Sequence, residues 1–455
     1  MIQQNRIHKP ITQSEISHRQ VLRIAVPMTL AFLSTPLLGL VDTMVIGQLG
    51  SAQLLGGIAI GAILCNFIFT IFNFLGRGTT ALTAQAVGAR NQPEIAGILG
   101  RTLLLATIAG VAIIALNIPL REAGIALMGG STEVNNATAT YFNIRIFSAP
   151  FVFANYAILG WHLGQGRAGI GLVLLTILNV TNMALSVLLV IGLGWSIAGV
   201  AWATVISEIL TLSIGLFLIW RHYGRVAIAP FALIINRARL AKLLAVNRDI
   251  MMRTMALLFV LAFFTSEGAR QGDLILAANA VLMNFFLFAG FFLDGFAVAA
   301  EQLVGSSIGA HARSRAVRAI SLSVTWGFAL GAVTSVCLYL TGPVIINFVT
   351  ISPEIREAAL IYLPWAAATP VVGALAFELD GAYIGATWSR EMRNWMLASV
   401  AISAIVWWST LPLLGNHGLW LALLVFLAAR GITLALRLPF NLKKTFSENK
   451  HATTL

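Results

Sequence analysis

The stretch FLGRGTTALTAQAVG at residues 74–88 returns later in the chain as FFLDGFAVAAEQLVG at residues 291–305. A similar pair, AILCNF at residues 62–67 and AVLMNF at residues 280–285, lies just upstream of each copy. Under a shift of 217 residues the two long copies match at five positions, which are Phe74 with Phe291, Gly78 with Gly295, Gln85 with Gln302, Val87 with Val304 and Gly88 with Gly305. The repeat therefore predicts a chain built from two related halves.

The chain around these copies is apolar almost throughout. Of its 455 residues, 58% are hydrophobic and 10% are charged, whereas an ordinary soluble domain carries about 25% charged residues. Apolar runs of about 20 residues, the length that crosses a bilayer as a helix, recur without the alternation of a membrane barrel strand. The sequence predicts an all-α membrane protein with twelve spans, at residues 21–46, 54–80, 98–120, 138–163, 169–191, 197–220, 250–268, 274–303, 319–340, 358–385, 394–414 and 418–438.

Lysine and arginine are concentrated on one side of these spans. Of the 29 such residues, 24 fall in the N-terminal segment, the even-numbered loops, the C-terminal end or the helix ends beside them. An excess of Lys and Arg marks cytoplasmic loops, so both termini are predicted to be cytoplasmic. The expected partner of this charge is the anionic headgroups of membrane lipids, and not nucleic acid.

The longest connection between spans divides them into six and six. The predicted organisation is a cytoplasmic N-terminal segment (1–20), an N-lobe (21–220), a cytoplasmic linker (221–249), a C-lobe (250–438) and a cytoplasmic tail (439–455). Six spans separate the repeat copies, so the lobes are expected to be parallel copies related by a pseudo-twofold axis along the membrane normal. Two such lobes can open a central cleft to either side in turn, which favours a transporter that acts as a monomer over a channel.

Motifs of catalysis are missing from the sequence. It contains no HExxH and no cluster among its seven histidines. We therefore expect a protein that is not an enzyme and that holds neither a metal ion nor an organic cofactor.

Seven segments, spread over nearly the whole chain, carry a family resemblance. They are PLLGLVDTMVIGQLGS (36–51), TALTAQAVGARN (80–91), VNRDIMMRT (246–254), AANAVLMNF (277–285), LDGFAVAAE (293–301), LDGAYIGATWSREMRN (379–394) and LLGNHGLWLALLVFLAARG (413–431). Together they are similar to the multidrug and toxic compound extrusion (MATE) transporters, and within them to the branch of the DNA-damage-inducible protein F.

The resemblance implies both a fold and an activity. It implies twelve helices in an N-lobe and a C-lobe, in the inner membrane of a bacterium, and export of cationic or amphipathic small molecules by alternating access in exchange for protons or sodium. The nearest alternative is a flippase of lipid-linked precursors from the same superfamily. A flippase would need several basic residues along the cleft, where the sequence offers Arg77 and little else.

An acid and two prolines stand out in the first span. Placing a charge at membrane depth costs about 2.5–3.5 kcal/mol on insertion scales. The resemblance matches Asp42 to the N-lobe aspartate of the family and implies a proton site, although an interfacial aspartate held by water fits the sequence equally. Burial disfavours the charged form of a carboxyl, so such a group can take up and release a proton.

Pro27 and Pro36, in the same span, each mark a potential bend. The resemblance implies a bend at Pro27 that follows protonation of the aspartate, and ordinary kinking of the helix is the alternative.

The fifth and sixth spans carry a second polar group. Asn182 and Ser186 are four residues apart and share a helix face, as Thr204 and Glu208 do. The resemblance places Asn182 and Thr204 around the first-helix aspartate, but where relatives carry an acid this chain has Ser186. A hard cation such as sodium prefers several oxygen ligands and compensating negative charge. The missing carboxylate therefore favours protons over sodium as the coupling ion.

Three further residues are candidates for the same network. Glu208 is expected either to replace the missing charge in part or to serve helix packing. Tyr141 and Asn155, on the fourth span, either complete the hydrogen bonds around Asp42 or bond across helices for packing alone.

The repeat itself predicts one contact between the lobes. Arg77 and Asp294 occupy equivalent positions in the two copies. If both face the pseudo-twofold axis, they can pair across the cleft in one conformation and separate in the other. The alternative is that each has its own partner within its lobe.

Overall fold

Twelve helical segments, each long and apolar enough to cross a bilayer, make up most of the described chain in a computed structural model. The structure describes residues 16–47, 51–224 and 229–452, and within these ranges it leaves out the side chains at positions 40, 42, 43, 52 and 448–452. The described residues form helices and no strand. The predicted all-α fold with twelve spans is therefore confirmed.

The N-lobe contains the first six spans, and several of them are broken. The second span consists of two helices that meet at Phe72 and Asn73, and the fourth passes through a 3₁₀ turn. In chain order the elements are α1 (His18–Gly47), α2 (Ala52–Ile71), α3 (Phe74–Gly88), α4 (Gln92–Ala115), α5 (Asn117–Met128), α6 (Thr132–Arg145), the 3₁₀ turn η1 (Ile146–Ser148), α7 (Ala149–Gly164), α8 (Ala168–Ser186), the π turn η2 (Val187–Gly192) and α9 (Ser196–Tyr223).

The C-lobe has longer, mostly continuous helices. A short helix, α10 (Phe231–Ile234), precedes it. Its elements are α11 (Arg237–Arg270), α12 (Asp273–Gly309), α13 (Arg313–Val349), α14 (Pro353–Gly385), α15 (Ser389–Leu414) and α16 (Asn416–Ala452). Residues 237–249, assigned to the linker from sequence, form the first turns of α11, and most of the assigned tail extends α16.

Two glycines of the sequence repeat lie at the contact between the lobes. A Cβ on Gly78 of α3 would lie 2.0 Å from Oδ1 of Asn247 on α11, and a Cβ on Gly295 of α12 would lie 2.0 Å from Oγ1 of Thr29 on α1. In each lobe, the second span thus packs against the first helix of the other lobe, where only a glycine leaves room. The repeat seen in the sequence is a reciprocal contact in space.

The matched glutamines show the same reciprocity two turns further along. Gln85 donates from Nε2 to the carbonyl of Gly385 at 3.0 Å and to Oγ1 of Thr387 at 3.1 Å, at the end of α14. Its counterpart Gln302 packs against Gly166, in the turn after α7, where its Nε2 is 3.3 Å from the position of a Cβ. These contacts join the lobes through the turns that follow their fourth spans.

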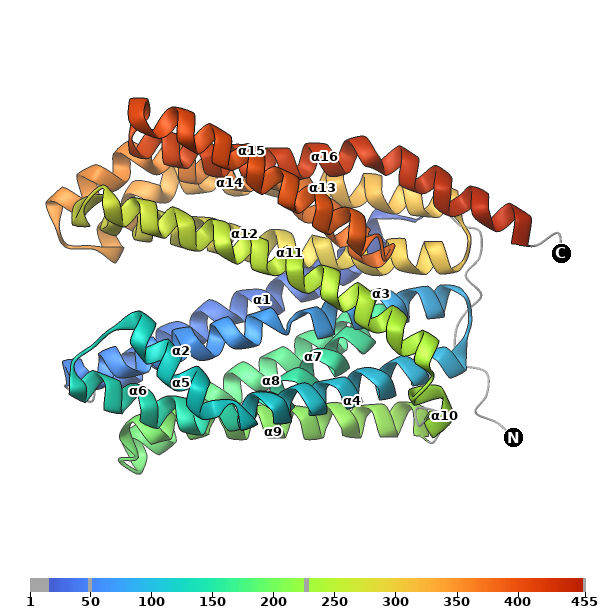
Figure 1. The fold of residues 1–455 in the computed structure, drawn as a ribbon, viewed down its shortest axis with the longest axis horizontal. Coiled ribbons are helices and arrows are strands. Elements are labelled where there is room, and N and C mark those ends of the chain that lie inside the picture. Colours follow the sequence, from blue (N-terminus) through green and yellow to red (C-terminus); the bar gives the residue numbers. More distant parts are fainter. Residues whose placement is uncertain (1–15, 48–50, 225–228, 453–455) are drawn as a thin grey trace.

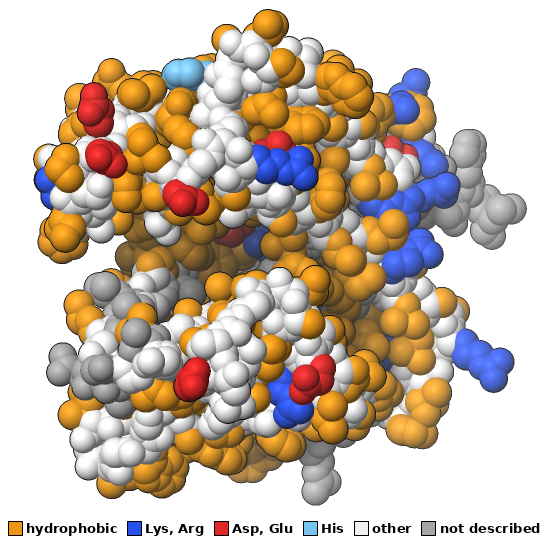
Figure 2. Space-filling model, turned by 60° about the vertical axis from the view of Figure 1, so that its left-hand side comes forward, with side chains coloured by type: hydrophobic (Ala, Val, Ile, Leu, Met, Phe, Trp, Pro, Cys, Tyr) orange, Lys and Arg blue, Asp and Glu red, His pale blue; other side chains and the backbone are white. Residues whose placement is uncertain are grey.

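The lobes meet at one end of the molecule and part at the other. Figure 1 shows the N-lobe below and the C-lobe above, with the start of α1 and the end of α16 at the end where α3 and α12 come together. At that end Gly309 of α12 lies so close to α3 that a Cβ would be 1.9 Å from the carbonyl oxygen of Gln85. Figure 2 shows the opposite end hollowed into a cleft between the lobes, with mixed polar and apolar walls.

Candidate functional site

A cavity of about 340 Å³ lies inside the N-lobe, between α1, α2, α6, α8 and α9. Three of the residues predicted from sequence line it from three different helices: Tyr141 on α6, Asn182 on α8 and Thr204 on α9. All three are buried. The structure therefore brings together side chains that lie up to 63 positions apart in the sequence, and it does so around an internal space.

Position 42 lies on the wall of α1 that borders this cavity. Its own side chain is outside the described residues, but Leu38, Gly39 and Ile46 of α1 line the cavity. Residues three and four apart share a helix face, so position 42 belongs to the same stripe. Both prolines lie inside α1, with Pro27 half-buried and Pro36 exposed.

The two hydroxyl residues of the predicted network make bonds along their own helices. Ser186 donates from Oγ to Oδ1 of Asn182 at 3.2 Å, one turn away on α8. Thr204 donates from Oγ1 to the carbonyl of Val200 at 3.1 Å, which leaves its hydroxyl oxygen able to accept a bond from the cavity. Ser186 does not line the cavity itself, and it contacts Asn182, which does.

Glu208 and Asn155 form a separate contact outside the cavity lining. Asn155 of α7 donates from Nδ2 to Oε2 of Glu208 at 2.7 Å and to the Glu208 carbonyl at 3.0 Å. Glu208 lies on α9 one turn from Thr204 and is buried. The amide thus fixes the carboxyl between α7 and α9, beside the cavity.

Arg145 lines the cavity too, although the sequence did not place it there. Its guanidinium donates to Oγ of Ser148 and lies 4.8 Å from the centre of the Phe69 ring. A fixed positive charge on the wall of a largely apolar cavity strongly affects which ions can enter. The signal was an arginine inside an apolar span, four residues after Tyr141.

Arg77 joins the two lobes by ion pairs. Its Nη2 is 3.1 Å from Oδ1 of Asp294, and its Nη1 is 3.4 Å from Oε2 of Glu301. Arg77 belongs to α3 and both acids belong to α12, so the guanidinium bridges the lobe interface. Glu301 is buried, while the Arg77 and Asp294 side chains keep part of their surface exposed.

The C-lobe holds a buried charge cluster that sequence reasoning missed. Arg253 of α11 and Arg430 of α16 both donate to Oδ2 of Asp380 on α14. Asp380 stands in an LDG motif (379–381), and its carboxylate is bound by these two side chains from different helices. In the sequence, both arginines belong to the basic ends of their spans. A charge near the end of a span gives the same sequence pattern whether it contacts lipid headgroups or a buried acid.

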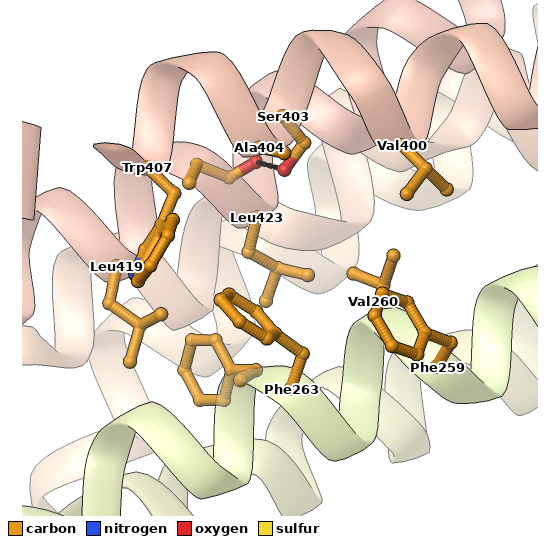
Figure 3. Close-up of a pocket in the computed structure, with 11 residues that line it drawn as sticks. Phe259, Val260, Phe263, Val400, Ser403, Ala404, Trp407, Leu419 and Leu423 are labelled. Carbon is orange, nitrogen blue, oxygen red and sulfur yellow. Dashed lines mark hydrogen bonds between the residues drawn. The ribbon is translucent and has the colours of Figure 1, made fainter. Parts of the chain in front are cut away.

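A second cavity, of about 160 Å³, lies in the C-lobe between α11, α15 and α16 (Figure 3). The rings of Phe263 and Trp407 meet edge to face there, with their centres 4.8 Å apart, and Leu423 lies beside them (Figure 3). The one hydroxyl in its lining, on Ser403, donates to the carbonyl of Ala422 at 2.8 Å. Apart from Ser403 and the indole N–H of Trp407, its lining is apolar and carries no charged side chain.

A metal centre has no basis in the described parts of the chain. Across residues 16–47, 51–224 and 229–452, no group of three or more His, Cys, Asp or Glu side chains lies close enough to hold a metal ion.

Comparison with known proteins agrees with the two-lobed arrangement. The MatE family model matches residues 27–188 and again residues 250–409, once in each lobe. DNA damage-inducible protein F of Escherichia coli (strain K12) is 41% identical over 420 residues, which cover 92% of this chain and 91% of that protein. The probable multidrug resistance protein NorM of Caulobacter vibrioides is 26% identical over 92% of this chain and 91% of its own length.

Solved structures show the same fold at low identity. One described as the outward-facing conformation of a multidrug resistance MATE family transporter of the MOP superfamily superposes with a TM-score of 0.84. It is 18% identical, and the match covers 94% of this chain and 96% of that one.

Proposed function

Because this chain belongs to the MATE family of multidrug efflux transporters, we propose that it exports cationic or amphipathic small molecules in exchange for protons, from the inner membrane of a bacterium. The observation that carries the proposal is the N-lobe cavity, which is lined by Tyr141, Asn182 and Thr204 and by residues of α1 one turn before and after position 42. We propose that the protein performs transport and no catalysis, and that it works as a monomer.

The proposed orientation follows from the basic residues. With 24 of 29 Lys and Arg residues on the side of the termini, that end lies in the cytoplasm. The contacts of Gly309 with α3 then close the cytoplasmic side, and the cleft in Figure 2 opens outward. In this conformation a substrate in the cleft can leave the cell.

Protons suit the cavity better than sodium does. Tyr141, Asn182 and Thr204 supply neutral oxygens, and Ser186 stands where a second carboxylate would be needed. Arg145 on the wall repels any cation that keeps its charge. A proton that binds to the carboxyl of Asp42 forms a neutral group, so it avoids that repulsion.

The proposed cycle couples the first helix to the cleft. Protonation of Asp42 changes the charge on α1, whose hydrogen-bond ladder is already interrupted at Pro27. Thr29, two residues beyond that proline, lies against Gly295 of the C-lobe. A bend of α1 at Pro27 therefore reaches the lobe interface directly.

Transport in vesicles under separate ion gradients tests the proposal. We expect a proton gradient alone to drive movement of a fluorescent lipophilic cation, and a sodium gradient alone to drive none. Asp42→Asn removes the titrating group and should lower proton-driven transport at least about tenfold. Asp273→Asn, an exposed acid in the first turn of α12, is the matched control and should transport normally.

Two results would contradict the proposal. Undiminished proton-driven transport by Asp42→Asn would remove Asp42 from the coupling step. Transport that requires sodium, at equal pH on both sides, would replace the proton as the coupling ion.

A further inference from the structure

A basic pocket lies where both lobes and the start of α11 meet, at the end of the molecule that carries the termini. Its volume is about 300 Å³. The N-lobe contributes Glu94 and Arg101 of α4, the C-lobe contributes Gly309 at the end of α12, and α11 contributes Arg239 and Lys242. None of these residues belongs to the N-lobe cavity or to the inter-lobe pair of Arg77.

The single carboxylate of the pocket is fully used in holding two arginines. Glu94 accepts from Arg101 with one oxygen and from Arg239 with the other. Arg101 is 2% exposed and also donates from Nη1 to the carbonyl of Leu233 on α10 at 2.8 Å. These bonds hold the two guanidinium groups in place in the pocket wall.

The pocket keeps an excess of positive charge after this pairing. Against one carboxylate stand Arg101, Arg239 and Lys242, which leaves a formal charge of about +2. Lys242 is exposed and makes no ion pair with any described residue. Arg239, at 39% exposed, also presents part of its guanidinium outward.

Phosphate is the chemical group that this arrangement suits. Arginine binds phosphate through paired N–H donors, and lysine binds it as a point charge. Basic pockets between membrane helices on the cytoplasmic side are suited to anionic lipid headgroups. With the orientation proposed above, this pocket opens at the level of the cytoplasmic headgroups.

We propose that this pocket binds a phosphate group, from an anionic lipid headgroup or from free phosphate, and thereby holds the cytoplasmic ends of the lobes together. The pocket is complete only while α3, α4 and the end of α12 stay close, so a ligand bound there stabilises the closed cytoplasmic end. The lipid-facing location rests on the proposed orientation, whereas phosphate binding itself does not.

Thermal unfolding of the purified full chain in a neutral detergent tests the proposal. The probes are phosphatidylglycerol, with zwitterionic phosphatidylcholine as its control, and inorganic phosphate, with chloride at equal ionic strength as its control. We expect a saturable rise in Tm with phosphatidylglycerol, phosphate or both. A response to phosphatidylglycerol alone identifies a lipid headgroup, and a response to phosphate alone identifies a soluble ligand.

A pair of variants locates the binding. Lys242→Gln should raise the half-saturating concentration about tenfold, the factor that corresponds to roughly 1.4 kcal/mol. Arg237→Gln removes the same charge from an exposed position on the same helix, outside the pocket, and should leave the response unchanged. Lys242 makes no ion pair with a described residue, so its loss should not disturb folding.

The proposal is overturned if neither probe raises Tm beyond its control, or if the two variants respond alike. The readout is stability and not transport, so this result stands apart from the outcome of the gradient experiment with Asp42→Asn.

Discussion

Arg77 contacts two carboxylates of the opposite lobe at once, so the pair that the sequence predicted with Asp294 is part of a group of three charges. Asp294 is 3.1 Å away and Glu301 is 3.4 Å away. The repeat predicted that Arg77 and Asp294 occupy equivalent positions, and it carried no information on Glu301. The two acids lie seven residues apart on α12, two helical turns, so one guanidinium can reach both.

Exchange of the paired charges tests whether the pair serves the transport cycle. Arg77→Asp and Asp294→Arg should each lower transport about tenfold or more, because each brings like charges together at the lobe interface. The double exchange should restore transport only in part, since an acid at position 77 then faces Glu301. Adding Glu301→Gln should complete the rescue. Transport rates of the four variants in vesicles decide the matter, and no rescue would mean that the two residues work independently.

Asn182 and Thr204 were predicted from the resemblance and Tyr141 from its place on the fourth span, while their exact partners were not predicted. Tyr141, Asn182 and Thr204 do line one cavity. The bond between Asn155 and Glu208 was not predicted, because it depends on how α7 and α9 are rotated about their axes. Helical spacing fixes which residues of one helix share a face, and only packing fixes what that face meets.

At the scale of elements, the two prolines of α1 lie in different surroundings. It runs unbroken from His18 to Gly47 with two prolines inside it. Pro27 is half-buried near the contact with α12, and Pro36 is exposed. A proline removes one backbone hydrogen bond, so the helix bends at lower cost there.

Replacing each proline separately tests the proposed bend. Pro27→Ala restores a ladder bond and should stiffen α1, with a loss of proton-driven transport of about tenfold and no loss of thermal stability. Pro36→Ala makes the same chemical change at an exposed site and should have a smaller effect. Equal and full transport by both variants would show that bending at Pro27 is not part of the cycle.

Element boundaries show where reasoning from sequence stops. The third predicted span, 98–120, was wrong at its end, since α4 stops at Ala115 and a separate helix, α5, begins at Asn117. The second span is broken at Phe72 and Asn73, whereas its repeat counterpart α12 is continuous. The length of an apolar run predicts that a segment crosses the bilayer. It does not reveal a one-turn break in the helix, because the residues on either side of the break are apolar too.

At the scale of the whole molecule, closure of one end depends on contacts without side chains. A Cβ on Gly309 would lie 1.9 Å from the carbonyl oxygen of Gln85, and a Cβ on Gly88 would lie 2.0 Å from that of Ser306. Backbone therefore meets backbone between α3 and α12. Such contacts cannot adapt by changing a rotamer, so a methyl group must push the lobes apart.

Gly309→Ala should shift the balance between conformations toward an open cytoplasmic end. Overpacking costs about 1–3 kcal/mol, so the equilibrium should move by about tenfold or more. Distances between spin labels on the two lobes measure the shift. Gly169→Ala, at a helical glycine with open space around it, is the matched control and should leave the distances unchanged. Identical distance distributions in both variants would contradict this account of closure.

The two-lobed plan could be predicted because it rests on quantities that many residues share. The twelve apolar runs are each averages over long stretches, and the repeat at a shift of 217 residues rests on five matched positions together, so single errors do not matter. The buried cluster of Asp380, Arg253 and Arg430 depends on three individual side chains from three helices. No average over the sequence contains that information.

The reciprocal glycine contacts also determine when the two lobes can pack together during synthesis of the chain. Gly295 packs against Thr29, and these residues leave the ribosome 266 positions apart. At about 5–20 residues per second, the first helix waits on the order of ten to fifty seconds for its partner. During that interval the newly inserted N-lobe presents an unfinished surface to lipid or to a chaperone. A glycine chosen for close packing thus also determines how long half of the protein must persist alone.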